Sequence, residues 1–193
     1  MIFPLLATFL LFSGTLGSAS DTIPIIIIDY TGHQNLNLDL IGNGALLTPI
    51  NGQPGTGAAS NEQWMVVGTS PFQLESNMFR GQYVSYASET VGRSGVHSQL
   101  VLGPVNSALN FTLQSAGAAG PNYVNIVAAG DLGNLAITSW AMANGTSGIP
   151  GDSATPMTLG VWTQSFNQAF TLKSFPGSAI SVIPVANCGD VDS

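Results

Sequence analysis

NQAFTLKS, residues 167–174, places an aromatic residue ahead of alternating apolar and polar positions, and two other segments of the chain also place an aromatic residue ahead of a short apolar stretch. These two segments read NEQWMVVG at 61–68 and ALNFTLQS at 108–115. Alternation with a period of two is typical of a strand that buries one face. Recurrence of one motif predicts a repeat architecture. We therefore expect three units, each closing on a strand whose aromatic residue lies in the core: Trp64, Phe111 and Phe170.

Each closing segment follows three further apolar pieces, so four strands are expected in each unit. The first pieces read IIIIDY at 25–30, FQLESN at 72–77 and YVNIVA at 123–128, the second NLNLDL at 35–40, QYVSYA at 82–87 and NLAITS at 134–139, and the third ALLTP at 45–49, QLVLGP at 99–104 and TLGVWT at 158–163. The units span about 23–68, 71–115 and 122–175 within a domain at 20–176. Three such units around a common axis can close an all-β barrel, whereas one cannot bury its apolar face alone.

Two segments rich in Gly, Pro and Ser interrupt this rhythm. NGQPGTGAAS at 51–60 belongs to the first unit, and MANGTSGIPGDSATP at 142–156 belongs to the third. Such composition is typical of turns and loops. Both segments are expected to be surface loops.

Composition limits the classes of function. Of 193 residues 7% are charged, the net charge is −7, and only Arg80, Arg93 and Lys173 are basic. Binding to a phosphate backbone needs several cations, which excludes nucleic acid as a partner. The chain has one cysteine and two distant histidines, and it lacks the common catalytic and phosphate-binding motifs. We expect neither an enzyme nor a protein that needs a metal or another cofactor.

The N-terminus reads MIFPLLATFLLFSGTLGSAS, an apolar run that ends in small residues. This layout predicts a signal peptide at 1–19, a secreted extracellular protein, and no membrane insertion of the mature form. A buried N-terminal strand or helix is the alternative. Secretion would make the sequons at Asn110 and Asn144 relevant and the protein a glycoprotein, with Asn144 the more accessible. In the C-terminal tail at 177–193, Cys188 has no intrachain partner, and the oligomeric state stays open.

Three units that close in a Gln-x-Trp-like form resemble the β-trefoil, and within it the ricin B-type lectin family. The resemblance covers about residues 23–175 and is carried most clearly by VWTQSFNQAF at 161–170. It implies a β-trefoil that binds glycans or glycoproteins. In that family an Asp after the second strand, an aromatic residue at the end of the third strand, and an Asn-Gln pair before the closing aromatic residue hold one sugar.

The resemblance carries over unequally among the units. The third unit has Trp162 as the stacking residue and Asn167 and Gln168 as the amide pair, with Thr138 in place of the Asp. The first unit has Asp39 and Asn61 but no aromatic residue at the stacking position. The second unit matches none of these positions. The expected function is carbohydrate binding, mainly through the third unit.

Several alternatives stay open at this point. Trp162 could instead pack beneath the 142–156 loop, Asn167 and Gln168 could serve only the turn backbone, and Asp39 could cap a turn. A trefoil can also recognise protein through its loops, for example as a protease inhibitor, or serve as a structural protein outside the cell.

Overall fold

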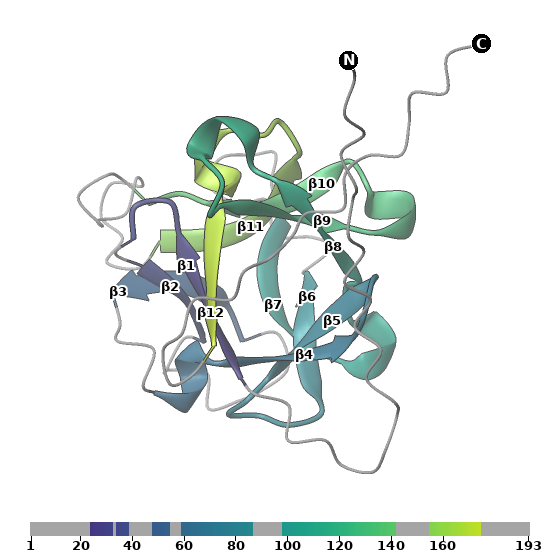
Figure 1. Ribbon diagram of the computed structural model, residues 1–193. Coiled ribbons are helices and arrows are strands. Elements are labelled where there is room, and N and C mark those ends of the chain that lie inside the picture. The colour runs from purple at the N-terminus through teal and green to yellow at the C-terminus, as the bar shows by residue number, and fades with distance from the viewer. Residues whose placement is uncertain are drawn as a thin grey trace, which may run out of the picture.

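The computed structural model of the chain describes residues 24–32, 34–38, 48–54, 59–86, 98–141 and 155–174. Twelve antiparallel strands run through these segments (Figure 1). The predicted all-β class is therefore confirmed. The predicted signal peptide at 1–19, the tail at 177–193, His33, His97, Asn144 and Cys188 lie outside the described residues.

The centre of the fold is a closed ring of strands. Going round the ring, β1 pairs with β4, β4 with β5, β5 with β8, β8 with β9, β9 with β12, and β12 again with β1. Closure leaves none of these strands as a free edge of the sheet. The bounds are β1 (Ile25–Asp29), β4 (Trp64–Gly68), β5 (Phe72–Ser76), β8 (Phe111–Ser115), β9 (Val124–Ala128) and β12 (Phe170–Ser174).

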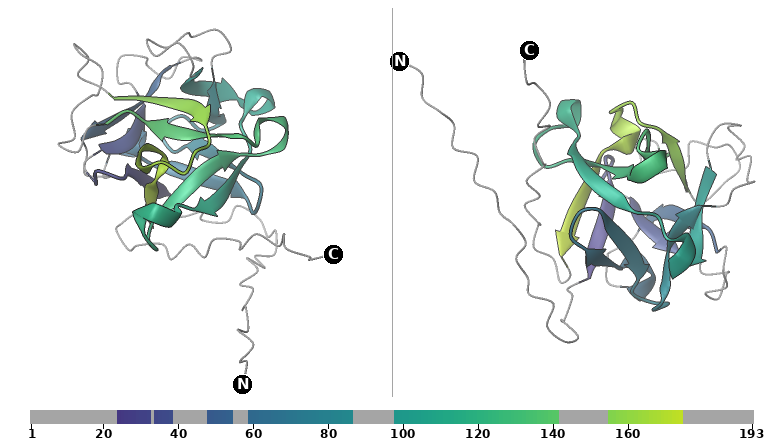
Figure 2. Two further views of the ribbon diagram at one scale, coloured as in Figure 1. Left: turned by 90° about the horizontal axis from the view of Figure 1, so that it is seen from above. Right: turned by 90° about the vertical axis from the view of Figure 1, so that its right-hand side faces the viewer.

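Three hairpins extend from the ring and meet one another (Figures 1 and 2). They are β2 (Gln34–Leu38) with β3 (Ile50–Pro54), β6 (Gln82–Tyr86) with β7 (Ser98–Pro104), and β10 (Leu135–Ser139) with β11 (Thr155–Val161). Their first strands pair with β1, β5 and β9, and β11 pairs with both β3 and β7. This connectivity is consistent with three four-stranded units, β1–β4, β5–β8 and β9–β12.

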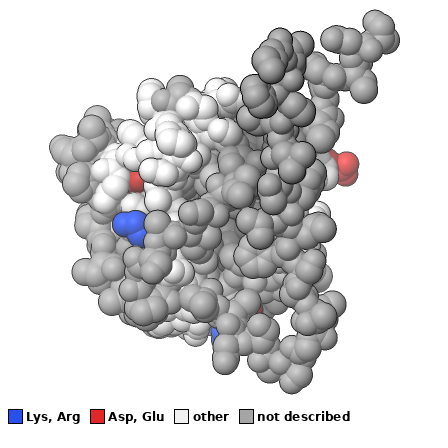
Figure 3. Space-filling model, in the orientation of Figure 1, with Lys and Arg blue, Asp and Glu red and all other residues white. Residues whose placement is uncertain are grey.

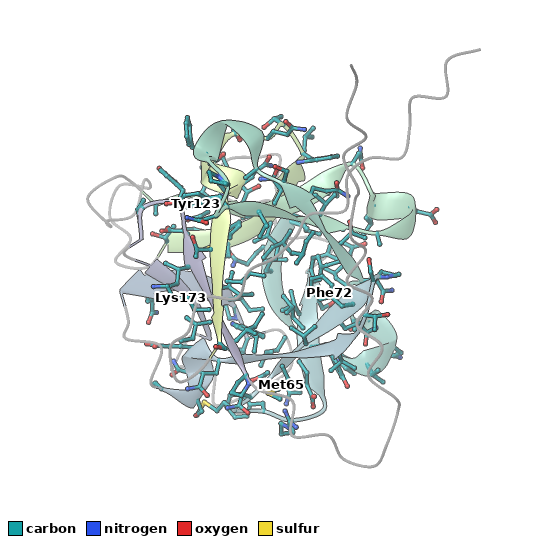
Figure 4. All side chains as sticks on the ribbon, in the orientation of Figure 1. Met65, Phe72, Tyr123 and Lys173 are labelled. Carbon is teal, nitrogen blue, oxygen red and sulfur yellow. The ribbon has the colours of Figure 1, made fainter. Side chains whose placement is uncertain are left out.

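The recurring aromatic residues lie in the core, as the sequence predicts. Trp64, Phe111 and Phe170 are all completely buried. The ring of Phe111 lies 6.2 Å from that of Phe72, which Figure 4 labels on β5. Truncation of a buried aromatic side chain to Ala costs roughly 3–5 kcal/mol, so each of these rings contributes substantially to stability.

One predicted strand was misplaced. The third piece of the first unit was expected at 45–49 and a loop at 51–60, but the strand runs over Ile50–Pro54. Gly52 pairs with Leu36 on one side and with Thr155 on the other, and the Ile50 side chain is fully buried. Residues such as Asn, Gly and Pro disfavour strands intrinsically, so pairing on both sides determines the structure of this segment against local preference.

Short 3₁₀ helices precede the closing strands. η2 (Ser60–Glu62) comes before β4, η3 (Val105–Ser107) before β8, and η6 (Phe166–Gln168) before β12. The position two residues before the closing aromatic residue is buried each time, although its chemistry differs: Glu62, Leu109 and Gln168. The remaining helices, η4 (Gly117–Ala119) and η5 (Gly130–Leu132), flank β9.

A buried carboxylate joins the first and third units. Asp29, at the end of β1, is 1% exposed. One of its oxygens accepts hydrogen bonds from the backbone and hydroxyl of Thr31, at 3.1 and 2.5 Å, and the other accepts one from the Ser139 hydroxyl at 3.0 Å. Three donors compensate for burial of the acidic group, which ties the end of β1 to β10.

The described surface carries few charges. Figure 3 shows few blue and red side chains among the described residues of one face. Arg80 lies 3.7 Å from Glu75, which also accepts a hydrogen bond from the backbone of Gly81. None of the described helices has the length and apolar character needed to cross a membrane. The described residues also include no cluster of three His, Cys, Asp or Glu side chains that could hold a metal ion.

Candidate functional site

Four of the six predicted sugar-contacting residues come together in the third unit. Thr138 lies on β10, Trp162 follows β11 directly, and Asn167 and Gln168 belong to η6. Pairing of β10 with β11 brings the second and third strands of this unit side by side. The 162–169 segment, which we name the η6 loop, lies at the end of the barrel where β12 begins (Figure 1).

The Gln168 side chain holds this loop together from inside. It is 2% exposed. Its amide nitrogen donates to the Val161 carbonyl at 2.8 Å and to the Thr138 hydroxyl at 3.1 Å. Its oxygen accepts from the backbone N–H of Thr163 at 2.9 Å. Both ends of the amide are therefore occupied, and Gln168 connects the two ends of the η6 loop to β10.

Trp162 is neither sealed in the core nor fully exposed. Its side chain is half-buried, and its indole N–H donates to the Asn125 side-chain oxygen at 3.1 Å. Its backbone N–H donates to the Asn134 carbonyl at 2.8 Å. With the polar edge bonded inward, the part of the ring that reaches the surface is aromatic carbon.

Sequence reasoning missed Asn125. This residue is completely buried in β9, and its amide nitrogen donates to the Gln168 carbonyl at 2.8 Å while its oxygen accepts from Trp162. Asn125 thus links the stacking candidate to the loop that carries the amide pair. An Asn within the apolar run YVNIVA was the available signal, since buried amides need partners.

The outer side of the η6 loop is neutral and polar. Thr163, Gln164 and Ser165 are exposed, and Asn167 is half-buried. The Asn167 oxygen accepts from the Ser165 hydroxyl at 2.5 Å, and the Ser165 hydroxyl also lies 2.9 Å from that of Thr163. Within the described part of the chain, the Asn167 amide nitrogen has no hydrogen-bond partner, so two donor hydrogens remain available at the surface.

Strain accompanies this loop. Gln164 has a φ of 57°, and it is the one non-glycine residue with positive φ among the described residues. A left-handed conformation costs an ordinary residue roughly 1–2 kcal/mol. The surrounding contacts therefore impose the loop conformation, which is a common property of binding sites.

The corresponding positions in the other units differ. In the second unit the Ser85 hydroxyl donates to the Ser107 carbonyl at 2.8 Å and Leu109 replaces the amide, so the second strand is tied to the 3₁₀ helix without a sugar-binding group. In the first unit Asn61 is 7% exposed within η2, away from the η6 loop, and Asp39 lies outside the described residues. The structure thus brings together Thr138, Trp162, Asn167 and Gln168 but not Asn61.

The loops required by the protein-binding alternative are only partly described. Residues 55–58 and 142–154 are outside the described ranges, so recognition of a protease through them stays a prediction. Asn110 is exposed immediately before β8, although the sequence placed it within the closing segment at 108–115. Its glycosylation also stays a prediction.

Several solved structures are similar to the structure of this chain. A ricin B-like lectin of Macrolepiota procera, in complex with lactose, is similar over 81% of this chain and 98% of its own, with a TM-score of 0.55 and 20% identity. The Rhizoctonia solani agglutinin is similar over 82% and 99%, with a TM-score of 0.59 and 17% identity. The designed threefold-symmetric protein ThreeFoil is similar over 77% and 96%, with a TM-score of 0.54 and 15% identity.

Comparison of the sequence alone gives no match. No protein-family model matches the chain, and no curated protein matches it. At identities of 20% or less, the structural likeness speaks for the fold and leaves function to the residues of the site. The closed ring, the three hairpins and these neighbours together establish that the chain has a β-trefoil fold, similar to that of ricin B-like lectins.

Proposed function

We propose that this protein binds carbohydrate through its third unit, with Trp162 and Asn167 contacting the sugar and Thr138 and Gln168 holding the loop that presents them. One observation carries the proposal: a half-buried indole whose N–H is bonded inward lies in the same short loop as an amide with unused donors. This pair supplies one flat apolar surface and one polar contact.

The chemistry suits a pyranose. Such a ring has an apolar face formed by C–H groups and a rim of hydroxyl groups. Aromatic carbon of Trp162 would cover the apolar face, and the Asn167 amide nitrogen would donate to a hydroxyl oxygen. Burial of Gln168 and Asn125 would keep both groups in place before the sugar arrives, which lowers the entropy cost of binding.

The ligands would be glycans or the glycans of glycoproteins, met outside the cell if the predicted signal peptide operates. The lactose complex of the Macrolepiota procera lectin supports this class of ligand. A neutral loop also favours it, since no residue from 162 to 169 is charged. We further propose that β1–β4, β5–β8 and β9–β12 are three equivalent units, of which the third retains most of the sugar-contacting set, with Thr138 in place of the Asp. Asp39 and Asn61 would form at most a second, weaker site in the first unit.

The test is a glycan array probed with the mature protein, followed by titration of each sugar that binds. Trp162→Ala should reduce binding at least tenfold. Trp140→Ala is the matched control, because Trp140 is also half-buried in the third unit and bonds its indole N–H to Thr158 at 3.0 Å. Absence of binding across a diverse array, or equal binding by Trp162→Ala and the wild type, would overturn the proposal.

A further inference from the structure

An aromatic side chain that the predicted sugar set does not include stands on the outside of the η6 loop. Phe166 is 57% exposed, and its neighbours along the loop are polar. Isolated exposed apolar residues are ordinary, whereas a group of them around a candidate site points to binding. Val161, the last residue of β11 directly before this loop, is 53% exposed, and Trp162 next to it is half-buried.

Phe166 lies beside an aromatic residue that is far from it in the sequence, Tyr30. The ring centroids of Phe166 and Tyr30 are 6.5 Å apart, with the planes tilted by 45°. The strand pairing explains their meeting: Asp29 pairs with Phe170 at the end of β1, so Tyr30 and the η6 loop leave the sheet at the same edge. Figure 4 labels Tyr123 at this end too, just before β9.

A hydrogen bond to the backbone beyond β10 holds Tyr30 in position. Its phenol O–H donates to the Ala141 carbonyl at 2.9 Å, just beyond β10, and its ring is half-buried. The Phe166 backbone is fixed as well, because its carbonyl accepts from the N–H of Ala169 at 3.0 Å in η6. Two rings held by separate elements form a prearranged surface, which loses little entropy when a ligand binds.

We propose that Phe166 and Tyr30 form a second sugar-binding surface beside the Trp162 site, so that the ligand is an oligosaccharide with at least two rings in contact with the protein. The inference rests on the proposed carbohydrate binding. Trp162 and Phe166 belong to one loop whose ends are tied through Gln168, so a sugar on Trp162 would direct its linked neighbour along this loop.

The surroundings of the pair fit a neutral polyhydroxyl ligand better than a protein partner. Exposed hydroxyl and amide groups of Thr163, Gln164 and Ser165 lie next to Phe166, and the loop carries no charge. Protein interfaces typically bury an apolar centre within a larger area. On the η6 loop, hydrogen-bonding groups lie between the apolar side chains. An oligosaccharide needs such a surface, because each of its rings has an apolar face and a rim of hydroxyl groups.

The experiment compares ligand lengths. The strongest oligosaccharide found on the array and the methyl glycoside of its terminal monosaccharide are titrated against the wild type, Phe166→Ala and Phe166→Trp. The wild type should bind the oligosaccharide more tightly than the monosaccharide. Phe166→Ala should lose about three- to tenfold in affinity for the oligosaccharide, the range of one aromatic stacking contact, and nothing for the monosaccharide. Phe166→Trp should keep the affinity.

Val105→Ala is the matched control, since Val105 is 60% exposed in η3 of the second unit. It should leave both affinities unchanged, and thermal melting of each variant confirms that it is folded. If the wild type binds the monosaccharide and the oligosaccharide equally, and Phe166→Ala changes neither, this inference falls while the proposed function stands. If the wild type binds no sugar, both fall.

Discussion

Thr155 carries a hydroxyl group that has no hydrogen-bond partner within the described part of the chain, although the residue is completely buried in β11. A buried polar group without a partner costs roughly 1–3 kcal/mol. Thr155→Val keeps the shape and removes this cost, so we expect the free energy of unfolding to rise by about 1 kcal/mol. Chemical denaturation with urea measures the change.

Thr158 in the same strand provides the comparison. Its hydroxyl accepts the indole N–H of Trp140, and Thr158→Val would leave that donor without its acceptor. This variant should lose about 1 kcal/mol of unfolding free energy. A loss in Thr155→Val as large as that in Thr158→Val would mean that the Thr155 hydroxyl is satisfied in solution.

Tyr30 makes stability depend on pH in the alkaline range. Burial, and secondarily the charge of Asp29, raise the pKa of the Tyr30 phenol above its ordinary value of 10.0. Below that value Tyr30 is protonated in both the folded and the unfolded state. As the pH rises through 10 the unfolded chain loses the proton first, so the free energy of unfolding falls until the folded protein also ionises.

Tyr30→Phe removes this titration and leaves the ring. The difference in melting temperature between wild type and variant, followed from pH 8 to pH 11, should therefore shrink as pH rises. A constant difference over this range would show that Tyr30 has the same pKa in both states, and that only its hydrogen bond to Ala141 matters.

At the scale of elements, the Gln168 side chain connects both ends of the η6 loop. Gln168→Leu introduces the residue type that Leu109 supplies at this place in the second unit, so the core remains filled. The variant leaves the Val161 carbonyl and the Thr163 N–H without their partners. We expect a loss of roughly 3 kcal/mol in unfolding free energy and a loss of roughly tenfold in sugar affinity.

Leu109→Ala serves as the control for Gln168→Leu. It removes core volume in the second unit but leaves the η6 loop intact, so stability should fall while sugar affinity in the folded protein stays unchanged. If Gln168→Leu binds sugar as tightly as the wild type, the loop does not need its internal amide, and Gln168 does not position the loop for binding.

The elements also show what the sequence could and could not predict. Strands rich in apolar residues, such as Ile25–Asp29 and Val124–Ala128, were placed within a residue or two because their patterns are strong. The strand Ile50–Pro54 was missed because its Asn, Gly and Pro residues imitate a loop, and only its neighbours make it a strand. Long-range pairing of this kind leaves no local signal.

The candidate site, too, could be predicted from the sequence only in part. The resemblance pointed to Trp162 and Asn167, which the η6 loop holds at or near the surface. It could not show that Thr138 and Gln168 are buried and bonded to each other, or that Asn125 receives the indole N–H. The resemblance also could not predict the contact between Phe166 and Tyr30, because this contact depends on the pairing of the first strand with the last.

At the scale of the whole molecule, three units of similar backbone structure carry different side chains at corresponding positions. Each has a fully buried aromatic residue at the start of its closing strand, which the barrel needs for its core. The position two residues earlier is Glu62, Leu109 or Gln168, and only the last is accompanied by an aromatic side chain after its third strand. A common architecture therefore preserves the core in all three units, whereas the proposed sugar-contacting set is concentrated in the third.

This asymmetry predicts the stoichiometry of binding. Isothermal titration of the mature protein with its strongest glycan should give one site per chain, because the second unit lacks the amide pair and the first lacks a stacking ring. Asn61→Ala should leave the number of sites and the affinity unchanged, whereas Asn167→Ala should weaken binding about fivefold through loss of one hydrogen bond to the sugar. Two sites per chain, with one removed by Asn61→Ala, would instead assign binding to the first unit as well.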